Sequence, residues 1–211
     1  MRPDLITNRS AADGIARLLG DARRSAEWRP GSVGPAAVEG DSVRTPPTKA
    51  SSMIVLGLDP GPTQTGWVEF DGDRVLRWGI DSNHDIPHMI YQGNSRAAYL
   101  AVEDMAPSRM PFGNEIRDTL LWIHGRRGIC DVWNDDSTLY CVSRTAVKMH
   151  LCGRLTGHGD SEVWKALVAR FGRHTKKQPN PVTCVSGHAR AALAVAVTVW
   201  DRLVDERRAE S

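Results

Sequence analysis

Apolar residues along the chain fall into runs with two different spacings. The run MIVLGLD at residues 53–59 is apolar up to its last position, which is typical of a strand buried on both faces. After Asn114, apolar residues recur three and four positions apart, which is typical of a helix with one buried side. Strands are predicted at residues 53–59, 66–70, 74–80, 96–103 and 138–142. Helices are predicted at residues 114–126, 144–151, 160–171 and 188–205, with a weakly marked helix at 88–92.

The order of these elements predicts an α/β domain. The turn residues Asp71, Gly72 and Asp73 join the second and third strands as a hairpin, so the first three strands are expected to be antiparallel. Helices separate the later strands, and such connections produce parallel strands with helices against the sheet. Residues 53–211 are therefore expected to form one domain with a mixed five-stranded sheet flanked by helices.

Residues 1–52 differ in composition from the rest, because they are rich in Ala, Arg, Gly, Pro and Ser. A helical pattern at residues 11–24 is too short to be stable alone, and a linker-like segment follows it. We expect a flexible N-terminal extension. Its first residues lack the apolar core of a secretory signal, and no apolar run approaches the roughly 18 residues of a membrane span. A cytoplasmic protein without a membrane partner is predicted.

Charge is unevenly distributed along the chain. The 211 residues contain 27 Lys and Arg against 25 Asp and Glu, a net charge of +2 that indicates no particular partner. However, residues 53–143 contain seven basic and thirteen acidic side chains, whereas residues 144–190 contain nine basic and two acidic ones. The basic segment fits a nucleic-acid partner, and it equally fits a solvated charged face. The four cysteines include no CxxC pair, which argues against a zinc site and fits reduced thiols in the cytoplasm.

Two predicted apolar strands end in carboxylates. Asp59 ends the first strand in GLDPGPTQTG, and Glu103 ends the fourth in YLAVE. Two buried neighbouring carboxylates repel each other unless a cation lies between them, and hard divalent cations prefer such oxygen ligands. If the two strands are neighbours, Asp59 and Glu103 form a candidate metal site. The alternatives are an Asp that caps the turn and a Glu in a salt bridge.

Other polar residues near these strands have competing interpretations. His188, in VSGHARAALAVAV, opens the last predicted helix and could point its imidazole at the strand ends. A capping or surface position is the more ordinary role of such a residue. Asp104 is expected on the opposite face from Glu103, because side chains alternate along a strand. Ser143 is interpreted as the N-cap of the helix that follows it, and either Asp160 or Ser161 as the N-cap of the next helix. Asp160 is also a spare carboxylate close to these residues in sequence, but the N-cap is the first interpretation.

Taken in order, these segments resemble the RuvC-like Holliday-junction resolvases of the RNase H-like superfamily, in particular their phage-type branch. MIVLGLDPGPTQTGW is similar to the first strand with its catalytic Asp. LAVEDMAPSRMPFGNEI is similar to the strand with the catalytic Glu and to the Met-Pro-x-Gly helix start of that branch. TAVKMHLCG, GDSEVWKALVARFG and GHARAALAVAVTVW are similar to the Val-Lys segment beside the active site, the next helix and the C-terminal helix with the last metal ligand. The resemblance covers residues 53–200 and implies an RNase H-like fold.

The resemblance also implies a site and a reaction. Asp59, Glu103 and His188 take the metal-ligand positions, and Lys148 lies beside the scissile phosphate. The implied reaction is hydrolysis of a DNA phosphodiester with two Mg²⁺ ions, for which Mn²⁺ is a possible substitute. The basic side chains expected to contact backbone phosphates are Arg144, Lys148, Arg154, Arg173, Lys176 and Lys177. From the sequence alone, Lys148 also fits a solvent-facing helix position.

Ala191 departs from the family pattern. Familiar members carry an Asp there, one helical turn after the position of His188. The site then has less negative charge and is expected to bind Mg²⁺ more weakly, to favour Mn²⁺, which accepts imidazole more readily, or to have lost catalysis.

The implied partner is branched DNA. The near-twofold symmetry of a four-way junction implies a homodimer. The helix at 114–126, with Ile116, Leu120 and Trp122, is a candidate dimer face, although a core-facing role fits equally. If a phage encodes the protein, it would act in the host cytoplasm.

Two other functions fit parts of the sequence. The pattern Asp-x-Gly-x-Thr-x-Thr-Gly at residues 59–66 also resembles the first phosphate loop of actin-like ATPases and sugar kinases. Those proteins need a second phosphate loop, for which the chain offers no convincing match. A non-catalytic junction-binding protein, weakened at Ala191, is the other alternative. The sequence favours a metal-dependent, structure-selective endonuclease.

Overall fold

A computed structural model of the protein describes residues 53–91, 95–105, 113–153 and 159–210. The strands in these ranges are β1 (Val55–Pro60), β2 (Gln64–Phe70), β3 (Val75–Ser82), β4 (Tyr99–Asp104) and β5 (Leu139–Ser143). The helices are α2 (Asp85–Tyr91), α3 (Asn114–His124), α4 (Ile129–Trp133), α5 (Arg144–Cys152), α6 (Asp160–Phe171) and α7 (Ala189–Ala209). The predicted helix at 11–24, most of the Met-Pro-x-Gly segment and Arg154 lie outside the described residues. The division of the chain after residue 52 stays a prediction.

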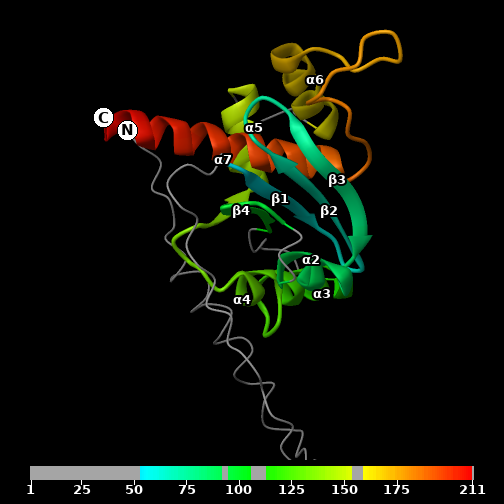
Figure 1. Cartoon of the computed structure of the whole chain (residues 1–211). Coiled ribbons are helices and arrows are strands. Elements are labelled where there is room, and N and C mark those ends of the chain that lie inside the picture. Colours follow the sequence, from blue (N-terminus) through cyan, green and yellow to red (C-terminus); the bar gives the residue numbers. More distant parts are fainter. Residues whose placement is uncertain (1–52, 92–94, 106–112, 154–158, 211) are drawn as a thin grey trace, which may run out of the picture. The chain divides into compact units, whose positions relative to one another are not determined.

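The five strands form one mixed sheet in the order β3-β2-β1-β4-β5 (Figure 1). β1 pairs with β2 and β2 with β3 in antiparallel directions, whereas β1 pairs with β4 and β4 with β5 in parallel. The predicted mixed five-stranded α/β fold is thus confirmed. Leu58 of β1 lies opposite Val102 of β4. Asp59 and Glu103 are each one position further on. They therefore lie side by side at the C-terminal ends of β1 and β4, because parallel strands end on the same side of the sheet.

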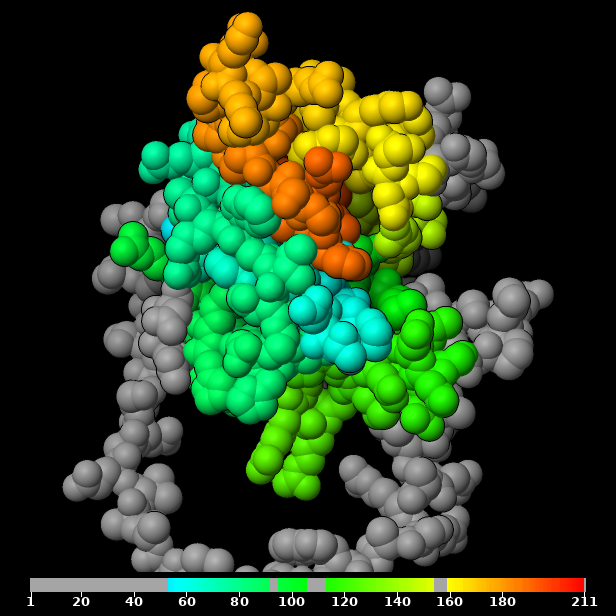
Figure 2. Space-filling view, turned by 90° about the vertical axis from the view of Figure 1, so that its right-hand side faces the viewer, coloured from blue at the N-terminus to red at the C-terminus, as the bar shows by residue number. Residues whose placement is uncertain are grey.

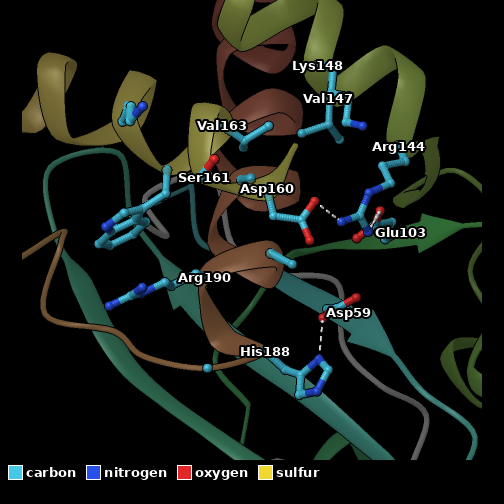
Figure 3. A pocket seen from close by; sticks show the side chains of 15 residues that line it. Asp59, Glu103, Arg144, Val147, Lys148, Asp160, Ser161, Val163, His188 and Arg190 are labelled. Carbon is cyan, nitrogen blue, oxygen red and sulfur yellow. Dashed lines mark hydrogen bonds and ion pairs between the residues drawn. The ribbon is translucent and has the colours of Figure 1, made fainter. Parts of the chain in front are cut away.

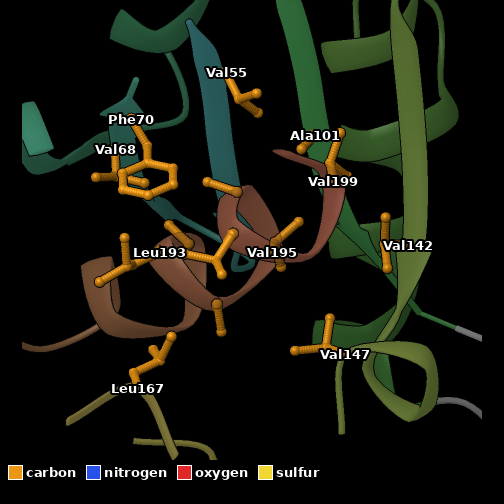
Figure 4. Close-up of a cluster of buried hydrophobic side chains, with 14 of the residues drawn as sticks. Val55, Val68, Phe70, Ala101, Val142, Val147, Leu167, Leu193, Val195 and Val199 are labelled. Carbon is orange, nitrogen blue, oxygen red and sulfur yellow. The ribbon is translucent and has the colours of Figure 1, made fainter. Parts of the chain in front are cut away.

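Helices cover both faces of the sheet (Figure 1). α7 crosses one face together with α5 and α6, and α2, α3 and α4 lie against the other. A hydrophobic core lies on each face of the sheet, and alternate residues of β1 point into one or the other. Val55 packs in the cluster under α7, and Leu56 packs in the cluster under α3 and α4. Figure 4 shows the first cluster, which Phe70 and Leu193 join from β2 and α7.

The Ala- and Val-rich sequence of α7 allows this helix to approach β1 closely. At Gly57, an added Cβ atom would lie 2.3 Å from the carbonyl oxygen of Ala192 and 2.8 Å from Cβ of Ala196. A larger side chain on either element would force them apart. The close contact positions Asp59 relative to His188, because Asp59 lies near the end of β1 and α7 begins directly after His188.

Several sequence predictions needed correction at the ends of elements. The helix α4 was not predicted, because five residues are too few to show a helical period. Asp160 is the first residue of α6 and not its cap: Gly159 takes the N-cap position, without a side-chain hydrogen bond. The cap predicted at Ser143 is confirmed, since its hydroxyl accepts a hydrogen bond from the backbone N–H of Ala146. Within the described ranges, no helix combines the length and apolarity needed to cross a membrane.

Candidate active site

A pocket of about 690 Å³ opens at the C-terminal ends of β1 and β4. It is lined by Asp59 from β1, Glu103 from β4 and His188 from the residue before α7, so folding brings the three predicted site residues together (Figure 3). Side chains of α5 and α6 complete the wall. Figure 2 views the molecule from a side on which the end of β1 (cyan), α6 (yellow) and the start of α7 (orange) lie next to one another.

Asp59 and His188 are in direct contact. His188 Nδ1 lies 3.0 Å from Oδ2 of Asp59, and it donates a hydrogen bond when that nitrogen is protonated. The Asp59 side chain is 15% exposed and that of His188 is 69% exposed. His188 occupies the N-cap position of α7 without capping it through its side chain, so the predicted capping role is not the one it has. Gly66 of β2 permits the approach, because a Cβ there would lie 2.6 Å from the His188 carbonyl carbon.

Glu103 is the most perturbed carboxylate of the pocket. Its side chain is only 10% exposed. Burial, and then the negative charge of Asp59, raise the pKa of Glu103 to about 7, against the opposing influence of Arg144. Two close carboxylates in a partly dry site disfavour ionisation, and a cation between them would remove that cost. The pair therefore fits a hard divalent cation.

Arg144, the first residue of α5, bridges two carboxylates. Its Nη1 donates to Oε1 of Glu103 at 3.1 Å, and its Nη2 donates to Oδ1 of Asp160 (Figure 3). A salt bridge was one of the roles that the sequence allowed for Glu103, and the structure shows this salt bridge with Arg144. The sequence placed Arg144 among the phosphate contacts and Asp160 first at an N-cap, with a spare carboxylate near the site as its other role, and it did not indicate this bridge.

The other basic side chains divide into two places. Lys148 lies half-buried in the pocket wall, one helical turn after Arg144. Arg173, Lys176 and Lys177 lie exposed in the loop between α6 and α7 and do not line the pocket.

Three further residues line the pocket, and the sequence analysis had singled out only Ala191 among them. Arg190 lines the pocket, but its guanidinium lies over the ring of Trp164, 4.4 Å from the centroid. Lys165 lines it too and pairs with Glu162 at 2.7 Å. Ala191 faces the same pocket, so the position where the family pattern has an Asp is indeed part of the wall.

Asp104 points away from the pocket, as strand alternation predicts. It accepts a hydrogen bond from Nε2 of His124, at 2.8 Å, on the α3 side of the sheet. This contact comes first among the causes that raise the pKa of His124, while burial opposes it. Only the first carboxylate of the Glu103–Asp104 pair is thus part of the candidate site.

The fold is similar to that of two solved RuvC structures. The structure of Thermus thermophilus RuvC in complex with a Holliday junction substrate matches with a TM-score of 0.52 at 19% sequence identity, over 72% of this chain and 96% of that one. A second T. thermophilus RuvC structure matches with a TM-score of 0.50 at 22% identity, over 72% and 97%. The chain has a RuvC-like fold.

Sequence comparisons add nothing to this relationship: no protein-family model matches the chain, and neither does any curated protein. Identity at this level to the RuvC structures shows the fold alone. The phage-type branch therefore stays a prediction, as do the roles of the site residues.

The pocket offers few metal ligands. Among the described residues, no group of three or more His, Cys, Asp or Glu side chains is arranged to hold a metal ion. What fits a cation is the pair Asp59 and Glu103, with the imidazole of His188 against Asp59. Mg²⁺ tolerates such a sparse set, because it usually keeps several waters and binds through one or two carboxylates plus substrate phosphate.

Proposed function

We propose that the protein is a metal-dependent endonuclease that resolves four-way or other branched DNA junctions. One observation carries the proposal: Asp59 and Glu103 stand together at the strand edge of a RuvC-like fold, and their closeness helps to raise the pKa of Glu103 to about 7. A carboxylate pair held at such a cost is expected where a cation offsets it. T. thermophilus RuvC is in complex with a Holliday junction substrate in one of the matching structures, and this suggests the substrate class.

In this proposal Asp59 and Glu103 hold the divalent cation, Mg²⁺ or Mn²⁺, and the resemblance implies two ions. The bound cation supplies an activated water and neutralises charge on the phosphate. Glu103 must be ionised to bind it. His188 orients the carboxylate of Asp59 through its Nδ1 and is a third candidate ligand. Lys148, in the pocket wall, pairs with the scissile phosphate and stabilises the charge that develops there.

The exposed basic loop gives the proposed DNA contacts outside the pocket. Arg173, Lys176 and Lys177 are proposed to bind backbone phosphates, together with Arg154, which lies outside the described residues. Such contacts make binding strongly dependent on salt and largely independent of sequence. We also propose a homodimer on branched DNA, acting in the cytoplasm, or in the host cytoplasm if a phage encodes the protein.

The decisive experiment is cleavage of an end-labelled four-way junction at low salt, with Mg²⁺ or Mn²⁺ and with a linear duplex of the same sequence as control. The parent protein is expected to cut the junction, and Asp59→Asn and Glu103→Gln are expected to abolish cutting. No cleavage by the parent protein with either metal would overturn the nuclease.

Ala191 in the pocket wall favours a second candidate function, a junction-binding protein without catalysis. It predicts a gel shift of the junction by the parent protein and no cleavage under any of these conditions. ATP hydrolysis that Asp59→Asn removes would instead support the actin-like alternative.

A further inference from the structure

The guanidinium of Arg144 already provides a positive charge for one of the two proposed metal ligands. Its Nη1 donates to Oε1 of Glu103 at 3.1 Å, while its Nη2 is bonded to Asp160 on the neighbouring helix. The backbone of Arg144 is held between two regular elements, because this residue directly follows Ser143, which ends β5 and caps α5. Folding therefore places the positive guanidinium of Arg144 against Glu103 even without a bound metal ion.

Glu103 has little room for two cations. Its side chain is 10% exposed, and the charged side chains that act on it are Asp59 and Arg144. A divalent cation bound to this carboxylate would sit about 2.1 Å from an oxygen, on the side where Asp59 adds its charge. The guanidinium would then lie within a few ångströms of a doubly charged ion, and like charges at that distance repel strongly in a partly buried site.

The rest of the pocket explains where Arg144 can go. The Asp160 side chain is 75% exposed and already holds the other arm of the same guanidinium. Arg144 can therefore leave Glu103 and remain attached to Asp160 at the pocket rim. The lining contains four basic side chains, Arg144, Lys148, Lys165 and Arg190, against three carboxylates, Asp59, Glu103 and Asp160. Of these four, Arg144 is the one that the described contacts join to a proposed metal ligand.

We propose that Arg144 and the divalent cation compete for Glu103, and that Asp160 retains Arg144 at the rim when the cation binds. This inference rests on the proposed function, since it deepens the description of the same site. Arg144 is a positioning residue in this scheme: it neutralises Glu103 before loading, and after loading it is turned toward the phosphate of the DNA. Metal affinity is thereby set by a residue that does not ligate the metal.

The test is titration of the full-length protein with Mn²⁺, followed by electron paramagnetic resonance of the free ion, without DNA. Arg144→Gln is expected to bind Mn²⁺ about tenfold more tightly than the parent protein, because the competing charge is gone. Lys165→Gln is the matched control. It removes the same charge from the same pocket wall, but Lys165 pairs with Glu162 at 2.7 Å, so a change within about twofold is expected.

The role of Asp160 is tested in two backgrounds. In the parent protein, Asp160→Asn is expected to weaken Mn²⁺ binding by about threefold, because Arg144 loses the partner that draws it away from Glu103. In the Arg144→Gln background the same change is expected to have no effect. Equal weakening in both backgrounds would mean that Asp160 acts on the metal directly, and it would overturn the retaining role.

The outcomes separate this inference from the proposed function. Binding to the parent protein that Glu103→Gln removes, with no gain in Arg144→Gln, would overturn the competition and leave the nuclease standing. A gain in Lys165→Gln as large as in Arg144→Gln would also overturn it, because a general charge effect would then suffice. Failure of both the parent protein and Arg144→Gln to bind Mn²⁺ would overturn the metal site and the competition together.

Discussion

Replacing Glu103 with Gln is expected to stabilise the protein when no divalent cation is present, although the change removes a residue that we propose to be catalytic. The pKa of Glu103 rises from an ordinary 4.5 to about 7 on folding, through burial and the charge of Asp59. Between these values the folded protein binds a proton that the unfolded chain has released. Stability therefore falls as the pH rises through this window, and the loss is complete above it. Gln is neutral at every pH and avoids the loss.

The size of the effect follows from the shift. A pKa raised from 4.5 to about 7 corresponds to about 3 kcal/mol at pH 8, because each unit is worth about 1.4 kcal/mol. At pH 5 the same calculation leaves less than about 1 kcal/mol, since this pH is only about half a unit above the unfolded pKa and the loss grows with every further unit up to the folded pKa. For a domain of this size, about 3 kcal/mol raises the midpoint of thermal unfolding by about 6–12 °C.

The assay is thermal unfolding in a chelating buffer at pH 5 and pH 8, followed by circular dichroism. Glu69→Gln is the control, because Glu69 is also a buried carboxylate, but both of its oxygens accept hydrogen bonds from Arg77, at 2.9 and 2.6 Å, whereas Glu103 receives one from Arg144 at 3.1 Å. That variant is expected to unfold at a lower temperature than the parent protein. An unfolding temperature of Glu103→Gln at or below that of the parent protein at pH 8 would refute the reasoning, as would an equal gain at both pH values.

Two further predictions concern packing and an ion pair whose carboxylate, Asp201, is only 15% exposed. Gly57→Ala is expected to cost about 3 kcal/mol in urea unfolding, because its Cβ would lie 2.3 Å from the carbonyl oxygen of Ala192; Gly113→Ala, with nothing within 4 Å, should stay within about 0.5 kcal/mol. Burial raises the pKa of Asp201, but hydrogen bonding to Arg170 helps to lower it overall, from 3.8 to about 2. This carboxylate therefore stabilises the fold above pH 4 and loses that effect as the pH falls toward 2. Asp201→Asn should therefore lose about 2 kcal/mol at pH 7, with a difference from the parent protein that shrinks between pH 4 and 2.5; a constant difference would contradict the assignment.

Local patterns made much of the fold predictable. The apolar run that ends at Asp59 and the run that ends at Glu103 identify two strands by themselves, because a strand buried on both faces has no polar side. The short helix α4, at Ile129–Trp133, escaped prediction because a single turn carries no periodic signal. The caps were harder still: Ser143 was identified correctly, whereas Gly159 takes the position that the sequence suggested for Asp160.

The candidate site was predictable only in part. Asp59 and Glu103 stood out because each ends an apolar strand, and His188 because it begins an Ala- and Val-rich helix. The bridge from Arg144 to Glu103 and Asp160 did not, because it joins residues 41 and 16 positions apart and depends on how α5 and α6 pack beside the sheet. No local pattern encodes such a distance.

The sequence by itself determined which side chains leave the strands at which face. Alternation alone puts Glu103 and Asp104 on opposite sides, and the structure has them there, one in the pocket and one against His124. Only the tertiary structure decided their chemistry. The pKa of Glu103 depends on its burial and on Asp59, a neighbour that strand pairing supplies, and His188 reaches Asp59 across 129 positions of the chain. Ionisation responds to the local dielectric and to nearby charges, and both exist only once the chain has folded.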